Sequence, residues 1–197
     1  MAKLSKTEKA ICKAMMELLN DIPFERITIS EIVKKADVSR SSFYNHFNQK
    51  TDINNCIIDN ICDEMSKEQM LFDREVITTD SLSGMRLERL NSFHRHKGDL
   101  VLLYKAGFGS KFTLTFRQRL YEVRTMFDYE FIDENGKHIV LSDGPIYDLR
   151  VWKNVNETIA NLELYYRCFS TLSASEFNDL IERAYRLTVI GGSRKKG

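Results

Sequence analysis

Residues 40–47 of this 197-residue chain carry polar side chains in an order that is unusual for a surface helix: Arg-Ser-Ser-Phe-Tyr-Asn-His-Phe. If the segment is helical, at about 100° per residue, Ser41 and Asn45 lie opposite Phe43, and Arg40 stands at the amino end. Guanidinium, hydroxyl and amide groups can hydrogen-bond to base edges and phosphates. Surface helices more often carry Glu and Lys, which are better helix formers than Ser and Asn. The pattern therefore favours a helix that reads a DNA groove over a solvated surface helix.

Local capping signals predict three helices in the first fifty residues. Ser5 and Glu8 fit a capping box, in which each side chain bonds the other residue's backbone amide. The first helix has one apolar face and stops near Asn20-Asp21-Ile22-Pro23. The apolar positions are Ala10, Ile11, Ala14, Met15, Leu18 and Leu19.

A second capping box, Thr28 with Glu31, opens a short second helix. Ser39 then caps a third helix, on which Phe43 and Phe47 are four residues apart and should both face the core. Two short capped helices joined by a turn of about three residues, behind a longer first helix, form a helix-turn-helix.

The charge distribution agrees with a nucleic-acid surface, though only mildly. Residues 1–50 carry nine basic and six acidic residues, whereas the rest of the chain carries 20 and 22. No uncharged apolar run reaches the length of about 18 residues that a membrane span needs, and the start has no apolar signal-peptide core. We therefore expect a cytoplasmic protein that does not contact the membrane.

Neither catalysis nor a metal site is indicated by the motifs. The sequence has no Gly-rich phosphate loop, no nucleophile elbow and no metal-ligand spacing, so we expect no enzyme activity, no metal and no cofactor. The four cysteines form no CxxC pair and are interpreted as reduced thiols, mostly in the core. They are Cys12, Cys56, Cys62 and Cys168.

Residues 28–53 resemble the DNA-binding signature of the tetracycline-repressor-like (TetR) family of transcriptional regulators. The resemblance covers about residues 6–65 and is most specific from Phe43 to Lys50, in the pattern FYxHFxxK. Other matched positions are Thr28, Ala36, Val38 and Ser39. The family usually has Gly where this chain has Asp37, and Asp is among the few residues that tolerate φ > 0. It also commonly has Gly-Thr where this chain has Ser41-Ser42, which keeps one hydroxyl.

The resemblance assigns five residues to the DNA phosphates: Thr28, Ser42, Tyr44, His46 and Lys50. Hydroxyl and imidazole groups donate to phosphate oxygens, and Lys50 adds charge at a helix amino terminus, where free amides favour an anion. Tyr44 has an alternative role as a packing aromatic. We interpret three more residues as base readers: Arg40, Ser41 and Asn45. Arginine can fork onto a guanine, and asparagine suits an adenine edge.

The larger remainder of the chain is also expected to be helical. A helix over about 51–74, with Ile53, Ile57, Ile61 and Met65 on one face, links a DNA-binding domain (1–50) to a helical ligand-binding and dimerisation domain (51–197). A break follows at 76–81. Further helices are expected at 82–96, 99–107, 110–127, 147–170 and 174–190, the last opened by a Ser173–Glu176 capping box.

One segment of the second domain does not look helical. Asn135-Gly136 stands between two β-prone runs, which predicts either a hairpin over about 131–141 with a two-residue type I′ turn, or an ordinary loop. The expected fold class is therefore all-α, with a small hairpin insert as one alternative.

The resemblance implies a sequence-specific regulator, most simply a repressor, that binds an inverted-repeat operator in double-stranded DNA as a homodimer. A small-molecule effector of unknown identity would modulate it. Several aromatic side chains could line an effector cavity or form plain core, so we assign no effector-binding residue. They are Phe112, Phe116, Tyr121, Phe127, Trp152, Tyr165, Tyr166 and Phe169. The alternative is an adaptor or co-activator of the same fold that works through protein partners, which a filled second domain would favour over a cavity of several hundred Å³.

Overall fold

The computed structural model describes residues 4–72, 79–126, 128–132 and 135–185 of the chain. These residues confirm a mostly helical fold with one small antiparallel hairpin. The amino-terminal elements are α1 (Lys6–Leu19), the 3-10 turn η1 (Phe24–Arg26), α2 (Ile29–Lys35) and α3 (Arg40–Tyr44). The remaining elements are α4 (Lys50–Phe72), α5 (Thr79–Arg95), α6 (Lys97–Lys105), α7 (Gly109–Arg124), β1 (Tyr129–Ile132), β2 (His138–Leu141), α8 (Gly144–Cys168) and α9 (Ala174–Tyr185).

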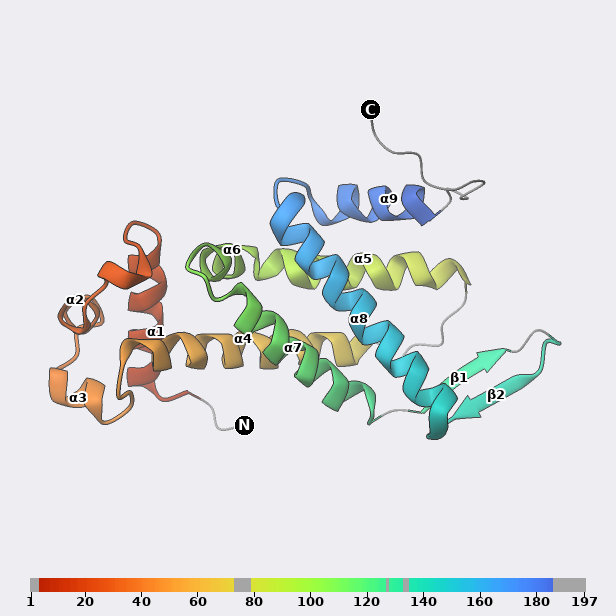
Figure 1. The fold of residues 1–197 in the computed structure, drawn as a ribbon, viewed down its shortest axis with the longest axis horizontal. Helices are drawn as coiled ribbons and strands as arrows, with labels where there is room; N and C mark the ends of the chain where they lie inside the picture. Colours follow the sequence, from red (N-terminus) through yellow and green to blue (C-terminus); the bar gives the residue numbers. More distant parts are fainter. Residues whose placement is uncertain (1–3, 73–78, 127, 133–134, 186–197) are drawn as a thin grey trace, which may run out of the picture.

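The first three helices form a head at one end of the molecule, and the hairpin lies at the other end (Figure 1). Helix α4 runs from the head into the body, where it packs against α7 and α5. Helix α8 packs across α7, and α9 lies against α5. Helix α4 is therefore shared by the head and the body, so a change in its direction moves the head.

Three helices begin with the predicted capping boxes, and these predictions are confirmed. The pairs are Ser5–Glu8, Thr28–Glu31 and Ser173–Glu176. In each pair the glutamate accepts the amide of the capping residue, whose hydroxyl accepts the amide of the glutamate. Hydrogen bonds from the capping residue hold the pKa of each capping-box glutamate below its usual value, because they favour the charged carboxylate.

The core is continuous from the head to the body. On α4, the four residues predicted to share one face are at most 6% exposed: Ile53, Ile57, Ile61 and Met65. Aromatic residues of α7 and α8 pack beside them, with Phe112 and Phe116 stacked at 5.7 Å between ring centroids. None of the helices in the described part of the chain has the length and apolar content that a membrane span requires.

Several helices start two or three residues earlier than predicted, including α6 at Lys97 and α8 at Gly144. The predicted break at 76–81 is too long, because α5 begins at Thr79; residues 76–78 lie outside the described residues. Helix α9 is described as far as Tyr185, so the predicted stretch 186–190 also lies outside.

The hairpin is confirmed, but its predicted two-residue turn is wrong. Strand β1 pairs with β2 from Tyr129↔Leu141 to Ile132↔His138, so five residues separate the strands. Gly136 still supplies the left-handed conformation that the longer loop needs, with φ of +78°. Strand β1 also starts at Tyr129, two residues before the predicted start, whereas β2 ends at Leu141 as predicted. The Asn-Gly signal thus located the turn but not its length.

Candidate nucleic-acid interface

The turn before α3 adopts the conformation that the resemblance implied. Asp37 has φ of +52°, while the Val38 amide donates to the Val33 carbonyl at 3.0 Å and the Asp37 amide to Lys34 at 3.4 Å. These are the two hydrogen bonds of a Schellman ending, in which the residue after the helix cap takes a left-handed conformation. Asp37 therefore stands in a position that normally suits glycine, and it fixes the angle between α2 and α3.

Helix α3 is held to the core from one side only. The Ser39 hydroxyl caps it by accepting the Ser42 amide at 3.0 Å. Phe43 is fully buried and Phe47 is 5% exposed, with their ring centroids 5.9 Å apart. The predicted cap and core residues are thus confirmed. The helix is short, because it ends at Tyr44 with Asn45 as its C-cap.

The three predicted base readers lie on the opposite, exposed side of α3. Ser41 and Asn45 are exposed, as is Arg40 at the amino end. The Arg40 guanidinium donates to the Ser30 hydroxyl on α2 and to the Tyr44 hydroxyl, both at 3.2 Å. These contacts hold the arginine along the surface formed by α2 and α3, so it is positioned before any DNA arrives.

Four of the predicted phosphate ligands surround this face. Tyr44 is 46% exposed, and its ring packs edge-on against Phe43 with the ring centroids 5.3 Å apart. It therefore packs against the core and still exposes part of its side chain to solvent. His46 is exposed, with its Nδ1 atom 3.7 Å from a Glu8 oxygen. The hydroxyl of exposed Thr28 donates to Glu31 at 2.7 Å. Ser42 is half-buried on the same short helix.

Lys50, the fifth predicted phosphate ligand, makes its contacts inside the head. Its ammonium donates to three backbone carbonyls, those of Phe24 at 2.7 Å, Glu25 at 3.0 Å and Ile27 at 2.9 Å. An ammonium group has three N–H donors, so all of them are engaged within the head. The sequence contains no signal for these contacts, because the acceptors are main-chain atoms 23 to 26 residues away.

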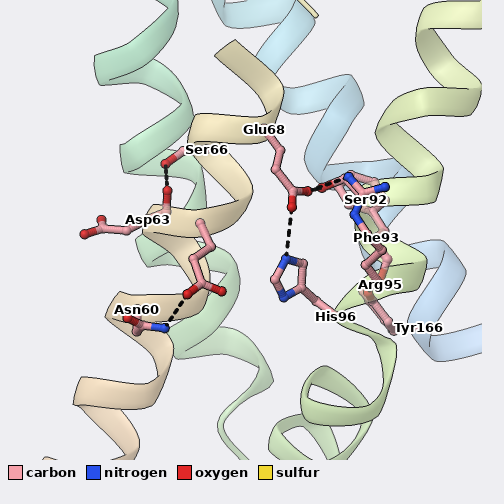
Figure 2. Close-up of polar contacts among 10 residues, drawn as sticks. Asn60, Asp63, Ser66, Glu68, Ser92, Phe93, Arg95, His96 and Tyr166 are labelled. Atoms are coloured by element: carbon pink, nitrogen blue, oxygen red, sulfur yellow. Dashed lines mark hydrogen bonds and ion pairs between the residues drawn. The ribbon is translucent and has the colours of Figure 1, made fainter. Parts of the chain in front are cut away.

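Polar contacts fix α4 against the end of α5 (Figure 2). A Glu68 carboxylate oxygen on α4 accepts the Ser92 hydroxyl and the Arg95 guanidinium, the latter at 2.8 Å, and the His96 ring lies 3.7 Å from the other oxygen. Burial raises the pKa of Glu68, but the hydrogen bonds from Ser92 and Arg95 outweigh it, so the net pKa lies below the usual value. The Tyr166 hydroxyl on α8 donates to the Phe93 carbonyl in the same region.

A small pocket lies between α5 and α8, with a volume of about 110 Å³. Its walls are mainly polar and come from two helices. The lining residues are Arg86, Arg89, Leu90, Phe93, Asn154, Glu157, Thr158 and Asn161. Of the aromatic residues considered as cavity lining, Phe112, Phe116, Tyr165 and Tyr166 are buried core, Trp152 is 55% exposed, and Phe127 lies outside the described residues.

Comparisons with known proteins agree with this geometry. Residues 11–55 match the model of the bacterial regulatory proteins of the tetR family. A TetR transcriptional regulator from Streptococcus agalactiae 2603V is 19% identical, covers 91% of this chain and 93% of its own, and has a TM-score of 0.55. A TetR-family transcriptional regulator from Syntrophomonas wolfei is 14% identical over 94% and 98% of the two chains, with a TM-score of 0.60.

A third solved structure, the dihydroxyacetone kinase operon activator DhaS, is 15% identical, covers 90% of this chain and 93% of its own, and has a TM-score of 0.56. No curated protein matches the chain. The capped α2–turn–α3 unit is a helix-turn-helix, the motif that can place a recognition helix in the major groove. Residues 11–55 are therefore similar to the DNA-binding part of the tetR family, and the whole chain has the fold of solved TetR-family transcriptional regulators.

Proposed function

We propose that the protein regulates transcription as a two-fold dimer on an inverted-repeat operator, with α3 of each protomer in the major groove. The observation behind this proposal is that α3, which Ser39 caps, exposes a polar side to solvent. A five-residue helix reads only a few base pairs, which is too little to specify a genomic site. Two copies in successive major grooves, about 34–36 Å apart, double the sequence that is read.

Helix α8 offers the face for such a dimer. Four of its outward residues lie within about 60° on a helical wheel, opposite its buried side. They are Ile146 (65% exposed), Leu149 (63%), Ala160 and Leu164 (43%). Leu180 of α9 is also 37% exposed. Large apolar side chains at this exposure on one helix face are typical of a surface that a partner covers.

Sedimentation velocity tests the dimer without DNA. Leu149→Glu should shift the protein from dimer to monomer, because it places a charge on the helix face that we propose the partner covers. Leu114→Glu is a matched control, since Leu114 is 62% exposed on α7, away from the α8 face. Wild-type protein that sediments as a monomer at micromolar concentration, and binds single half-sites as well as inverted repeats, would contradict the proposal.

Within this docking, we propose that Arg40, Ser41 and Asn45 read bases, and that Thr28, Ser42, Tyr44 and His46 hold phosphates. Asn45→Ala should weaken operator binding by about 1–3 kcal/mol and random DNA binding by less, because base contacts set sequence preference. Arg40→Ala should behave similarly. An operator selected from a random DNA library supplies the probe, and equal losses on both DNAs would remove these residues from the base-reading set.

The proposed sign of regulation is repression, since a bound dimer needs only to cover a promoter. One solved structure of similar fold is an operon activator, so the test is a promoter-reporter measurement in which either sign can be scored. Lower expression on induction of the protein supports repression, and higher expression overturns it.

The source of the regulatory signal has two candidates, a small effector and a protein partner. Small-molecule pockets usually measure about 300–1,000 Å³, and the pocket between α5 and α8 is well below that size. This pocket is therefore too small for a drug-sized effector, and both candidates are kept for the test. Adding the dialysable and the retained fractions of a cell extract separately to the protein–operator complex distinguishes them, because only a protein partner would be confined to the retained fraction.

A further inference from the structure

The contacts of Lys50 give it a structural role in the head. Its ammonium is half-buried, bonded to the Phe24, Glu25 and Ile27 carbonyls, and lies 4.5 Å from the centroid of the Phe24 ring. These carbonyls belong to η1 and to Ile27 after it, where a helical turn ends; the Phe24 carbonyl also accepts the Ile27 amide at 3.2 Å. A cation is the favoured partner at such an end.

A phosphate could reach this ammonium only by displacing one of the three carbonyls. That exchange would leave a backbone acceptor unpaired inside the head, which offsets the gain from the new contact. The same lysine is the first residue of α4, so its side chain ties the start of α4 to the segment that leads into α2.

The Phe24 ring continues this path into the body. It meets the Phe108 ring edge-on, with the ring centroids 4.9 Å apart and an interplanar angle of 90°. Phe108 lies in the turn between α6 and α7, where its amide donates to the Leu103 carbonyl at 2.8 Å. Gly107 before it has φ of +84°, a left-handed conformation that favours glycine. The position of the Phe108 ring is therefore set by a tight turn.

These contacts add to the packing between head and body, in which α1 of the head contacts α4 and α6. The ring contact from the α6–α7 turn, with an ammonium over the same ring, fixes the segment that leads into α2 as well. Figure 1 shows the α6–α7 turn beside the head, on the side where α1 meets α4.

We propose that Phe108, Phe24 and Lys50 form the joint through which the carboxyl-terminal helices set the position of the DNA-reading head. Lys50 then acts as a positioning residue and not as a phosphate ligand. The consequence for DNA rests on the proposed DNA-binding function. The joint itself is a property of the free protein, so one arm of the test uses no DNA.

The DNA arm compares salt dependence among variants, on a random duplex of fixed length. Each phosphate contact contributes about 0.9 to the slope of log affinity against log salt. Lys50→Met should weaken binding with the wild-type slope, because the ammonium is proposed to bond within the head and not to a phosphate. A drop of about one for Lys50→Met would show a phosphate contact and overturn the positioning role.

Lys50→Arg provides a second variant that keeps the charge. Arginine is a good phosphate ligand, but its planar fork cannot donate to three converging carbonyls as an ammonium does. Positioning therefore predicts weaker DNA binding for Lys50→Arg at every salt concentration. Wild-type affinity in this variant would favour the phosphate role and count against the proposal.

The arm without DNA measures amide hydrogen exchange at Arg26 and Ile27, whose amides bond to Pro23 and Phe24 carbonyls in the head. Phe108→Leu should speed this exchange by about 2- to 13-fold, the change expected when an edge-to-face aromatic pair is lost. Tyr129→Leu is the matched control, because it removes a ring pair of 5.7 Å centroid separation at the hairpin end. Unchanged exchange in Phe108→Leu would overturn the joint. If Phe108→Leu showed faster exchange but the wild-type protein bound no DNA, the joint would stand and only the proposed DNA-binding function would be rejected.

Discussion

Substitutions at Asp37 test whether the turn between α2 and α3 is strained. Its φ of +52° lies in the left-handed region, which costs an ordinary L-residue roughly 1–2 kcal/mol and aspartate somewhat less. Glycine removes this cost but adds about 0.4–1 kcal/mol of unfolded-state entropy. We therefore expect Asp37→Gly to raise the free energy of unfolding by about 0.5 kcal/mol, and Asp37→Ala to lower it by about 1 kcal/mol.

Asp37→Asn separates backbone strain from charge. Asparagine tolerates the left-handed conformation as aspartate does. Aspartate, however, places a negative charge just beyond the carboxyl end of α2, where the helix dipole disfavours anions. Because Asp37 is exposed, neutralising it should add only about 0.3 kcal/mol, near the lower limit of such effects.

Urea unfolding followed by circular dichroism measures all three variants at one protein concentration and one pH. The expected order of stability is Gly and Asn above the wild type, and Ala below it. Alanine at or above the wild type would refute the strain argument, because alanine has neither the freedom of glycine nor a local polar side chain. If the Gly variant were more stable than the wild type and the Asn variant equally stable, the strain argument would stand and the dipole argument would be rejected.

Three further predictions concern stability. The low folded-state pKa of the capping-box glutamates means that their contribution is present above their ordinary pKa of about 4.3 and is lost as pH falls through the folded value. Replacing all three by Gln should flatten the decline in unfolding free energy between about pH 5 and pH 3, measured by urea titration at each pH. Gly109→Ala should cost about 1–3 kcal/mol in thermal unfolding, because its Cβ would lie 2.3 Å from the Tyr104 ring, whereas Gly98→Ala meets nothing within 4 Å and should cost nothing. Gln69→Leu should stabilise by about 1 kcal/mol in the same assay, because the buried Gln69 amide has no hydrogen-bond partner among the described residues.

The head could be predicted from sequence because its determinants are local. The Ser5 and Thr28 boxes, the Ser39 cap and the Phe43–Phe47 spacing each lie within five residues, and each is present in the structure. The left-handed conformation of Asp37 was implied by the resemblance, because the family usually has Gly at this position. These patterns predict structure reliably because residues close in the chain remain in contact in any tertiary fold.

The role of Lys50 could not be predicted in the same way. Its acceptors are backbone carbonyls, which every residue carries, and Phe108 lies 84 residues from Phe24 in the chain. The hairpin shows a milder form of the same limit. Asn135-Gly136 indicated a turn, but the strand pairing that fixed a five-residue loop depends on how β2 packs against α8. Tertiary packing therefore decided the details that local patterns left open.

Helix α4 is held at both ends, and this decides how the head can move. Lys50 binds its start to the head, and Glu68 binds it to the end of α5, 18 residues further on, or roughly 27 Å along the helix axis. A tilt of about 5° at Glu68 would displace the start of α4 by about 2 Å, far more than the 2.7–3.2 Å range of a hydrogen bond allows. The head must then either lose the carbonyl bonds of Lys50 or move with α4. Three charge-assisted bonds at about 1.5–3 kcal/mol each outweigh one aromatic pair at about 0.5–1.5 kcal/mol. The Phe24–Phe108 contact therefore resists small movements of the head, and it is the first of these contacts to be lost when α4 tilts further.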